Sequence, residues 1–210
     1  MEGISNSMIH IRIKILLIIL TLIVIVFGAY VRLTDAGLGC PDWPGCYGKL
    51  VPSGISGYEG SSEYNAGKAW REMIHRYLAG LLGIGIFGLA LHSLRSGNGF
   101  RSLEFALVPL VVFQSMLGMF TVTLLLKPLV VSLHLMGGLT ILSVLWWSLL
   151  RDLDLRGSVL KKFGLLNIVG WLAFSALIVQ IFLGGWTSTN YAALACTDFP
   201  SCHGSLMPPL

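Results

Sequence analysis

Charged residues are scarce in this chain of 210 residues, and their scarcity excludes a water-soluble fold. Only 11% of the residues are charged, against about 25% in typical soluble domains, and the mean hydropathy is +0.79. The net charge of +4 comes from basic residues scattered between long apolar runs rather than gathered on one face. This pattern argues against a nucleic-acid partner and indicates that the basic residues are topology signals.

The first apolar run lacks a small-residue cleavage site, so we interpret it as a membrane span rather than a signal peptide. Five runs have the length of about 20 apolar residues that crosses a bilayer core of about 30 Å. They cover residues 15–31, 74–94, 103–126, 129–150 and 163–186. The sequence therefore predicts an all-α integral membrane protein embedded in lipid.

Lysine and arginine residues in short connections predict the orientation of these spans. They precede the first span and lie between the second and third and between the fourth and fifth: Arg12, Lys14, Arg95, Arg101, Arg151, Arg156, Lys161 and Lys162. We expect these segments and the N-terminus to face the cytoplasm. The loop of residues 32–71, the turn at 127–128 and the segment after residue 186 then lie on the outer side.

An internal repeat divides the chain. A shift of 156 residues lays positions 28–52 over positions 184–208 without a gap, and ten of these 25 positions are identical. Each copy is the outer end of a span followed by an external loop, which predicts a parallel repeat about four helices long. We therefore expect a four-helix transmembrane bundle over residues 1–162. Residues 163–210 would be the first helix and cysteine loop of a second, repeated bundle, as in a truncated or split member of a larger design.

The cysteines lack the Cys-x2-Cys spacing that is typical of zinc sites and of reactive dithiols. Instead, Cys-x5-Cys occurs once in each copy of the repeat, on the expected outer face, where disulfides persist. Two interpretations stay open for these pairs. They are staples that shape a loop, or they exchange thiols during substrate delivery.

Three ionisable residues lie within one turn at the start of the second span: Glu72, His75 and Arg76. Residues three and four apart share a helix face, so their side chains project together. Ionisable groups inside a span are costly and usually mark function. The plainer interpretation is a Glu72–Arg76 ion pair at the helix start beside an interfacial His75.

A second intramembrane histidine, His134, lies about as far into the fourth span as His75 lies into the second. Two imidazoles at matching depth on nonadjacent helices of a four-helix bundle suit axial heme ligation. Gly137 and Gly138 follow one turn later and leave room for a macrocycle or for close helix packing. The alternative is that His134 only hydrogen-bonds a neighbouring helix. The remaining histidines, in the N-terminal tail (His10), at the cytoplasmic end of the second span (His92) and in the second loop (His203), receive no ligand role.

Together these segments resemble the heme A synthase family, the cytochrome oxidase assembly enzymes that convert heme O to heme A. The resemblance rests on TDAGLGCPDWPGCYG (34–48), EMIHR (72–76), QSMLGMFTVT (114–123), HLMGGL (134–139) and GGWTSTNYAALACTDFPSC (184–202). It implies eight helices in two similar halves, of which the first holds the heme O substrate and the second a heme b. Helices six to eight and the heme b histidines are absent from this chain, so a separate chain could supply that half.

The resemblance also implies roles for individual residues. His75 and His134 would flank the iron of heme O, and Glu72 would be the catalytic carboxylate that serves oxidation of a heme methyl to a formyl. Arg32 and Arg76 would be partners of the heme propionates. Disulfides would join the cysteines of each outer loop, Cys40 with Cys46 and Cys196 with Cys202.

The expected location is the bacterial inner membrane, with heme O synthase and cytochrome oxidase assembly factors as partners. Two other classes of function stay open. One is a nonenzymatic heme-binding assembly subunit. The other is a membrane thiol oxidoreductase, against which the missing Cys-x-x-Cys counts.

Overall fold

Five long helices make up the computed structural model, which describes residues 2–52, 65–95, 103–153, 164–196, 198 and 201–205. The helices are α1 (Glu2–Leu33), α2 (Ala66–Arg95), α3 (Leu103–Thr123), α4 (Pro128–Asp152) and α5 (Gly164–Thr189). Each contains a stretch long and apolar enough to cross a membrane. The predicted all-α membrane architecture and its five spans are confirmed.

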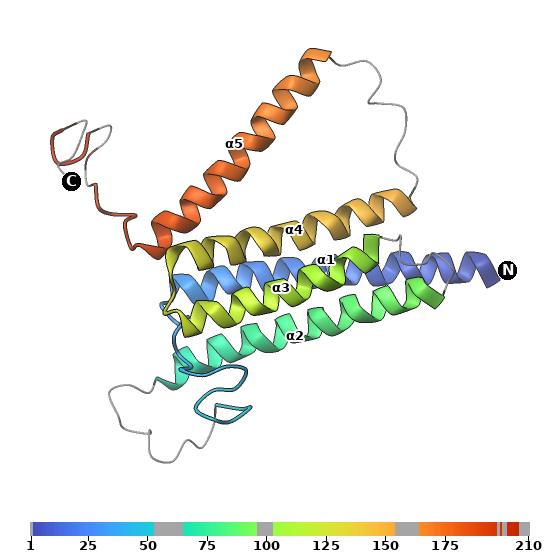
Figure 1. Cartoon of the computed structure of the whole chain (residues 1–210), viewed down its shortest axis with the longest axis horizontal. Helices are drawn as coiled ribbons and strands as arrows, with labels where there is room; N and C mark the ends of the chain where they lie inside the picture. The colour runs from blue at the N-terminus through green and yellow to red at the C-terminus, as the bar shows by residue number, and fades with distance from the viewer. Residues whose placement is uncertain are drawn as a thin grey trace.

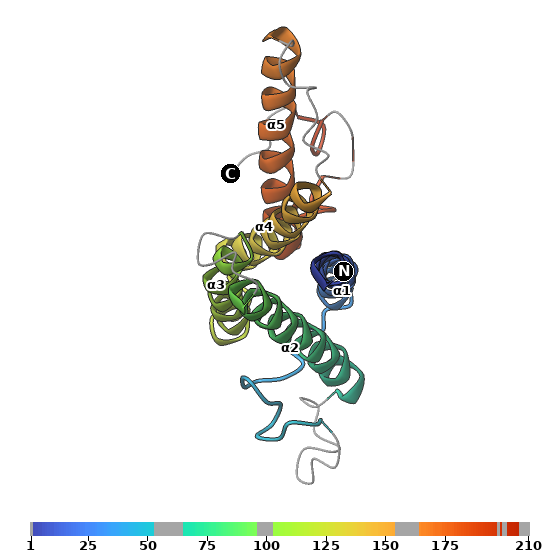
Figure 2. The same ribbon diagram turned by 90° about the vertical axis from the view of Figure 1, so that its right-hand side faces the viewer.

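Helices α1 to α4 lie side by side as a bundle (Figures 1 and 2). α1 packs against α2 and α4, and α3 packs against the same two helices. We call the end that carries the first cysteine loop the loop end. The main apolar core fills the half of the bundle away from it, with Leu17, Leu82, Ile86, Leu107 and Leu145 among its buried side chains.

Helix α1 is longer than the predicted first span of residues 15–31, because it begins at Glu2 and includes both His10 and Lys14. Lys14 is completely buried within the bundle, and its Nζ lies 2.5 Å from Glu104 Oε1 and 2.7 Å from Asp152 Oδ2. These carboxylates on α3 and α4 compensate the buried charge, which allows the helix to continue through it. His10, expected in a tail, instead lies 3.3 Å from Asp152.

Helix α5 leans away from the bundle and meets it only near the loop end (Figure 1). No residue of its most apolar stretch is buried. There α5 packs against α4, with Gly185 beside Ser132. Two hydrogen bonds also join this end to the end of α1: the Ser188 carbonyl accepts one of 2.5 Å from Arg32, and the Tyr191 hydroxyl donates one of 2.7 Å to Asp35. The predicted boundary between residues 162 and 163, and with it Arg101, Arg156, Lys161 and Lys162, lies outside the described residues.

The two cysteine loops share backbone features at equivalent described positions. Disulfides join Cys40 to Cys46 and Cys196 to Cys202, each with a Cα separation of 4.7 Å, as predicted. Positive φ angles recur at positions offset by 156: 52° and 54° at Asp35 and Tyr191, 53° and 54° at Tyr47 and His203, and 73° and 74° at Gly48 and Gly204.

An aspartate holds each loop in the same way. Asp42 accepts backbone hydrogen bonds from Tyr47 at 2.6 Å and Gly48 at 2.8 Å. Its repeat equivalent, Asp198, accepts bonds from residues 203 and 204 at 2.7 and 2.9 Å. The repeat found in the sequence is therefore also a structural repeat.

Candidate functional site

A cavity of about 1100 Å³ opens in the loop half of the bundle, above the apolar core. Its walls come from all five helices and from the first cysteine loop. The five predicted polar site residues all line it: Arg32, Glu72, His75, Arg76 and His134. Pockets for drug-sized ligands measure about 300–1000 Å³, so this space suits a ligand of macrocycle size.

The two histidines reach the cavity from different helices. His75 is the tenth residue of α2 and His134 the seventh of α4, so their depths below the helix starts differ by about 4.5 Å at 1.5 Å per residue. The difference arises because α2 begins at Ala66, before the predicted second span of residues 74–94. Its first turns extend alongside the cysteine loop. In both rings Nδ1 is buried and has no hydrogen-bond partner in the described part of the chain.

Glu72 is nearly inaccessible, with 4% of its surface exposed. Its Oε2 accepts a hydrogen bond of 2.8 Å from the backbone N–H of Cys40, and its Oε1 accepts one from Arg76. Hydrogen bonds to an ionised carboxylate are stronger than those between neutral groups. The carboxylate is therefore held in one orientation, and it is tied directly to the first disulfide.

The Arg76 guanidinium binds the cysteine loop. Its Nη1 donates to the carbonyl of Asp42 at 2.8 Å and to that of Gly45 at 2.5 Å, while Nη2 pairs with Glu72. The plainer interpretation of the sequence, an ion pair between Glu72 and Arg76, is thus present in the structure. The ion pair lies on the same helix as His75, which lines the cavity.

Arg32 retains more hydrogen-bonding capacity. One Nη donates to Ser188, the guanidinium carbon lies 4.3 Å above the ring of Tyr191, and Nε is buried without a partner among the residues described. A cation with a free donor at the cavity wall can bind an anionic group of a ligand. Of the two arginines, Arg32 is therefore better placed for that role.

The model of the cytochrome oxidase assembly protein family (COX15-CtaA) matches residues 12–210 of this chain. The chain belongs to this family. It is 44% identical over 202 residues to the heme A synthase of Shewanella oneidensis, covering 92% of this chain and 61% of that protein. It is 28% identical to the heme A synthases of Alkalihalophilus pseudofirmus and Halalkalibacterium halodurans, over 96% and 90% of this chain and 68% and 62% of those proteins. The chain thus spans 61–68% of the length of these relatives. No solved structure matches it.

The histidine pair of this family member fits an iron macrocycle better than a bare metal ion. Within the described ranges, no three His, Cys, Asp or Glu side chains gather in a way that could hold a metal ion. A structural zinc site needs four protein ligands, whereas a heme supplies four ligands from its own ring and needs only axial partners. Two imidazoles beside a large cavity meet that need.

Sequence reasoning missed several residues that shape the site. Gln114 donates from Nε2 to the backbone carbonyl of His134 at 2.7 Å, and its Oε1 is buried without a partner in the described chain. Tyr77 donates to the carbonyl of Leu50 and ties down the end of the first loop. A polar Gln inside an apolar span is itself a signal of a polar contact between helices, and it could have identified Gln114.

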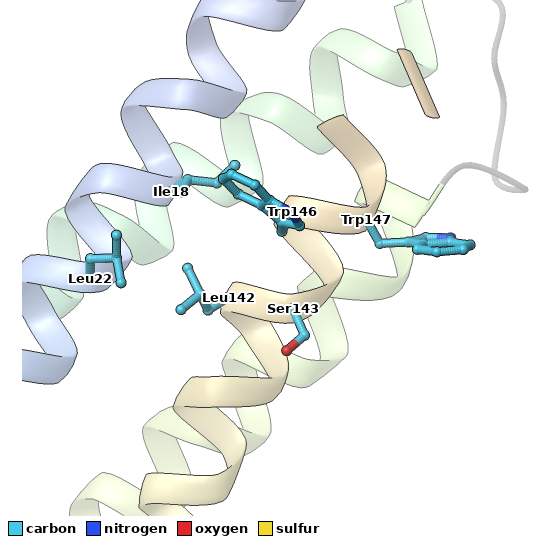
Figure 3. Close-up of a pocket in the computed structure, with 6 residues that line it drawn as sticks. All are labelled: Ile18, Leu22, Leu142, Ser143, Trp146 and Trp147. Carbon is cyan, nitrogen blue, oxygen red and sulfur yellow. The ribbon is translucent and has the colours of Figure 1, made fainter. Parts of the chain in front are cut away.

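A second, smaller pocket of about 390 Å³ lies between α1 and α4 in the apolar half (Figure 3). Ile18 and Leu22 of α1 face Leu142 and Trp146 of α4 across it, and Trp147 points away. Ser143 is its one polar lining residue, and the Ser143 hydroxyl already donates to a carbonyl of its own helix. This pocket offers no group for chemistry.

Proposed function

We propose that this chain is the part of a heme A synthase that binds heme O and oxidises one of its methyl groups to a formyl, for the assembly of cytochrome oxidase. The observation that carries the proposal is the placement of His75 and His134 on one cavity large enough for a macrocycle. Family membership and the names of the relatives support the same activity.

The residues present fit a heme. Both imidazoles line the cavity. Because Nδ1 of each ring is buried and has no partner among the described residues, we assign iron binding to the other ring nitrogen, Nε2. Arg32 would bind a propionate, whereas Arg76 would anchor the cysteine loop. The heme, when bound, supplies the redox-active iron and the methyl group that is oxidised.

Glu72 would act on that methyl group from the cavity wall. A fixed carboxylate can stabilise positive charge that develops on a carbon, or accept a proton from an attacking water. Conversion of a methyl to a formyl with oxygen from water releases four electrons and four protons. The electrons would pass to an acceptor outside this chain, and a base beside the reacting carbon would take up protons. The contacts with Cys40 and Arg76 would keep this carboxylate oriented.

The wider assignments belong to the same proposal. We place the protein in the bacterial inner membrane with its N-terminus in the cytoplasm, so that both disulfide loops face the oxidising side. Heme O synthase would deliver the substrate. The second half, with its heme b, would come from a segment or chain beyond these residues.

Heme binding tests the first part of the proposal. The purified chain, supplied with iron protoporphyrin IX, should show a Soret band and a six-coordinate low-spin spectrum. His75→Ala and His134→Ala should each abolish the low-spin form and weaken binding by about tenfold or more. Absence of a Soret band in the parent would contradict the proposal and return the thiol oxidoreductase to consideration.

Turnover tests the role of Glu72, with heme O and heme A separated by chromatography in a protein that includes the second half. Glu72→Gln should keep the bound heme and slow the oxidation by about 100-fold or more, because general acid–base groups contribute about that much. A glutamine cannot accept from both Cys40 and Arg76, so loop detachment alone could lower the rate. The matched control is therefore Arg76→Gln, which loosens the loop and keeps the carboxylate.

The comparison of these two variants decides the role. If Glu72→Gln is much slower than Arg76→Gln, the carboxylate serves the reaction. Equal rates would assign Glu72 to the loop anchor alone. Heme binding without any conversion in the parent would favour the nonenzymatic assembly subunit.

A further inference from the structure

Each of the two cavity histidines packs against a glycine of the preceding helix. A Cβ on Gly28 of α1 would lie 2.8 Å from Cε1 of His75 and 3.3 Å from its Nε2. A Cβ on Gly118 of α3 would lie 3.2 Å from Cε1 of His134 and 3.8 Å from its Nε2. Both imidazoles therefore rest where any other residue would place a side chain, and both glycines line the cavity.

Reciprocal contacts hold these helix pairs in register. Gln114 of α3 packs on Gly137 of α4, and its amide bonds the carbonyl of His134, one turn from the contact of His134 with Gly118. Between α1 and α2, Leu17 packs on Gly85, where a Cβ would lie 2.5 Å from Leu17 Cδ2. The backbone on which each ring rests is thus fixed relative to the helix that carries the ring.

From this geometry we propose that Gly28 and Gly118 are positioning residues, which set the direction in which His75 and His134 present Nε2 to a common ligand atom in the cavity. The inference rests on the proposed heme site and names two residues that would tune it. An added methyl at position 28 would meet Cε1 of His75, with Nε2 at 3.3 Å and Nδ1 at 3.5 Å, so it would press on the ring edge that carries both nitrogens. The ring would have to rotate away, since the backbone behind it cannot yield.

Other glycines show that this arrangement is not a general property of the helices. A Cβ on Gly80 or Gly88 of α2 would meet nothing within 4 Å. Gly80 lines the cavity, but Gly88 does not, so Gly88→Ala is a matched control with the same chemical change in a membrane span. Alanine is favoured over glycine in helices, so this control should fold as well as the parent.

The experiment uses the full chain in detergent, loaded with iron protoporphyrin IX and examined by absorption and electron paramagnetic resonance. Gly88→Ala should reproduce the low-spin spectrum of the parent. Gly28→Ala should shift most of the heme to a high-spin, five-coordinate form and weaken binding about tenfold. Gly118→Ala should change the spectrum in the same direction but less, because its contact is longer.

The outcomes separate this inference from the proposed function. If the parent itself binds no heme, the proposed site fails. If the parent binds and both Gly28→Ala and Gly118→Ala retain its spin state and affinity, the positioning role is overturned while the site stands. If size-exclusion chromatography shows that Gly28→Ala does not fold, the spectrum of the milder Gly118→Ala decides alone. A purely structural effect would lower the melting temperature without changing the spin state.

Discussion

The two cysteine loops share a sequence pattern, a disulfide and the backbone angles of their equivalent described residues, yet they differ in their surroundings. Cys40 and Cys46 are completely buried against Ala69 and Met73 of α2, whereas Cys196 is exposed. The conformation of each loop therefore depends on its own disulfide and aspartate. Packing of the first loop depends on α2, and it is α2 that makes this loop part of the site.

The two loops also meet through the ends of the helices that precede them. Arg32 contacts Ser188 and Asp35 contacts Tyr191, and both pairs are separated by 156 residues, which is the offset of the repeat. Residues that touch their own equivalents lie on the axis that relates two copies. The contact between α1 and α5 is thus a contact between corresponding surfaces of the repeat.

Arg76 binds the first cysteine loop to α2, and its removal should lower the free energy of unfolding more than the other changes considered below. Arg76→Met would leave the buried Glu72 carboxylate unpaired and free the loop carbonyls, at a cost of about 3–5 kcal/mol in the free energy of unfolding. Thermal unfolding in detergent, followed by circular dichroism, measures the loss. Arg71→Met on the same helix is the control, with an expected change within about 0.5 kcal/mol because Arg71, among the described residues, bonds to Gly67 of its own turn alone. Similar melting temperatures for the two variants would show that the loop is not held by Arg76.

Removing the disulfides one loop at a time should give an intermediate effect. Replacement of Cys40 and Cys46 by alanine should lower the stability of the bundle by about 2 kcal/mol from chain entropy, plus the lost packing against α2. The same change at Cys196 and Cys202 should leave the unfolding of the bundle within about 0.5 kcal/mol of the parent, because that loop packs on little. Equal losses at both loops would mean that the second loop is also part of the packed structure.

The smallest effect concerns Asp35, which follows α1 and contacts Tyr191, the corresponding residue after α5. Hydrogen bonds from Lys68 and Tyr191, in that order of size, hold the pKa of this carboxyl below its ordinary value of 3.8. A depressed pKa means that the contact stabilises the fold above the ordinary value and is lost as the pH falls through the folded pKa. Carbon-13 titration of labelled aspartate in detergent should show this midpoint below 3.8.

Two variants sharpen that measurement. Lys68→Ala should move the Asp35 midpoint toward 3.8 further than Tyr191→Phe does, because Lys68 contributes the larger part of the shift. Asp35→Asn identifies the resonance. A midpoint at or above 3.8 in the parent would show that α2 and α5 do not meet at this residue in solution.

Features that depend on local sequence were predicted correctly. The five spans follow from apolar length, and the two disulfide loops follow from the repeat, because both patterns are complete within a few dozen residues. The expectation that His75 and His134 share a cavity came from their depth, although the actual start of α2 at Ala66 shows that depth counted from helix ends is only approximate.

Features that depend on how helices are rotated against each other were not predicted. Gly28 and Gly118 gain their importance from the ring that each one meets, and no spacing within α1 or α3 reveals it. Arg76 turns to the cysteine loop because the loop docks beside it. The ion pairs of Lys14 were not predicted either, because its two carboxylate partners lie far along the chain.

The burial of Lys14 has a consequence for the order in which the nascent chain assembles in the membrane. Asp152, one of its partners, lies 138 residues downstream, so it leaves the ribosome only after four helices have been made. Glu104 of α3 is made earlier and can pair with the ammonium group before Asp152 is available. The site around Lys14 is therefore built in two steps, first with α3 and then with α4.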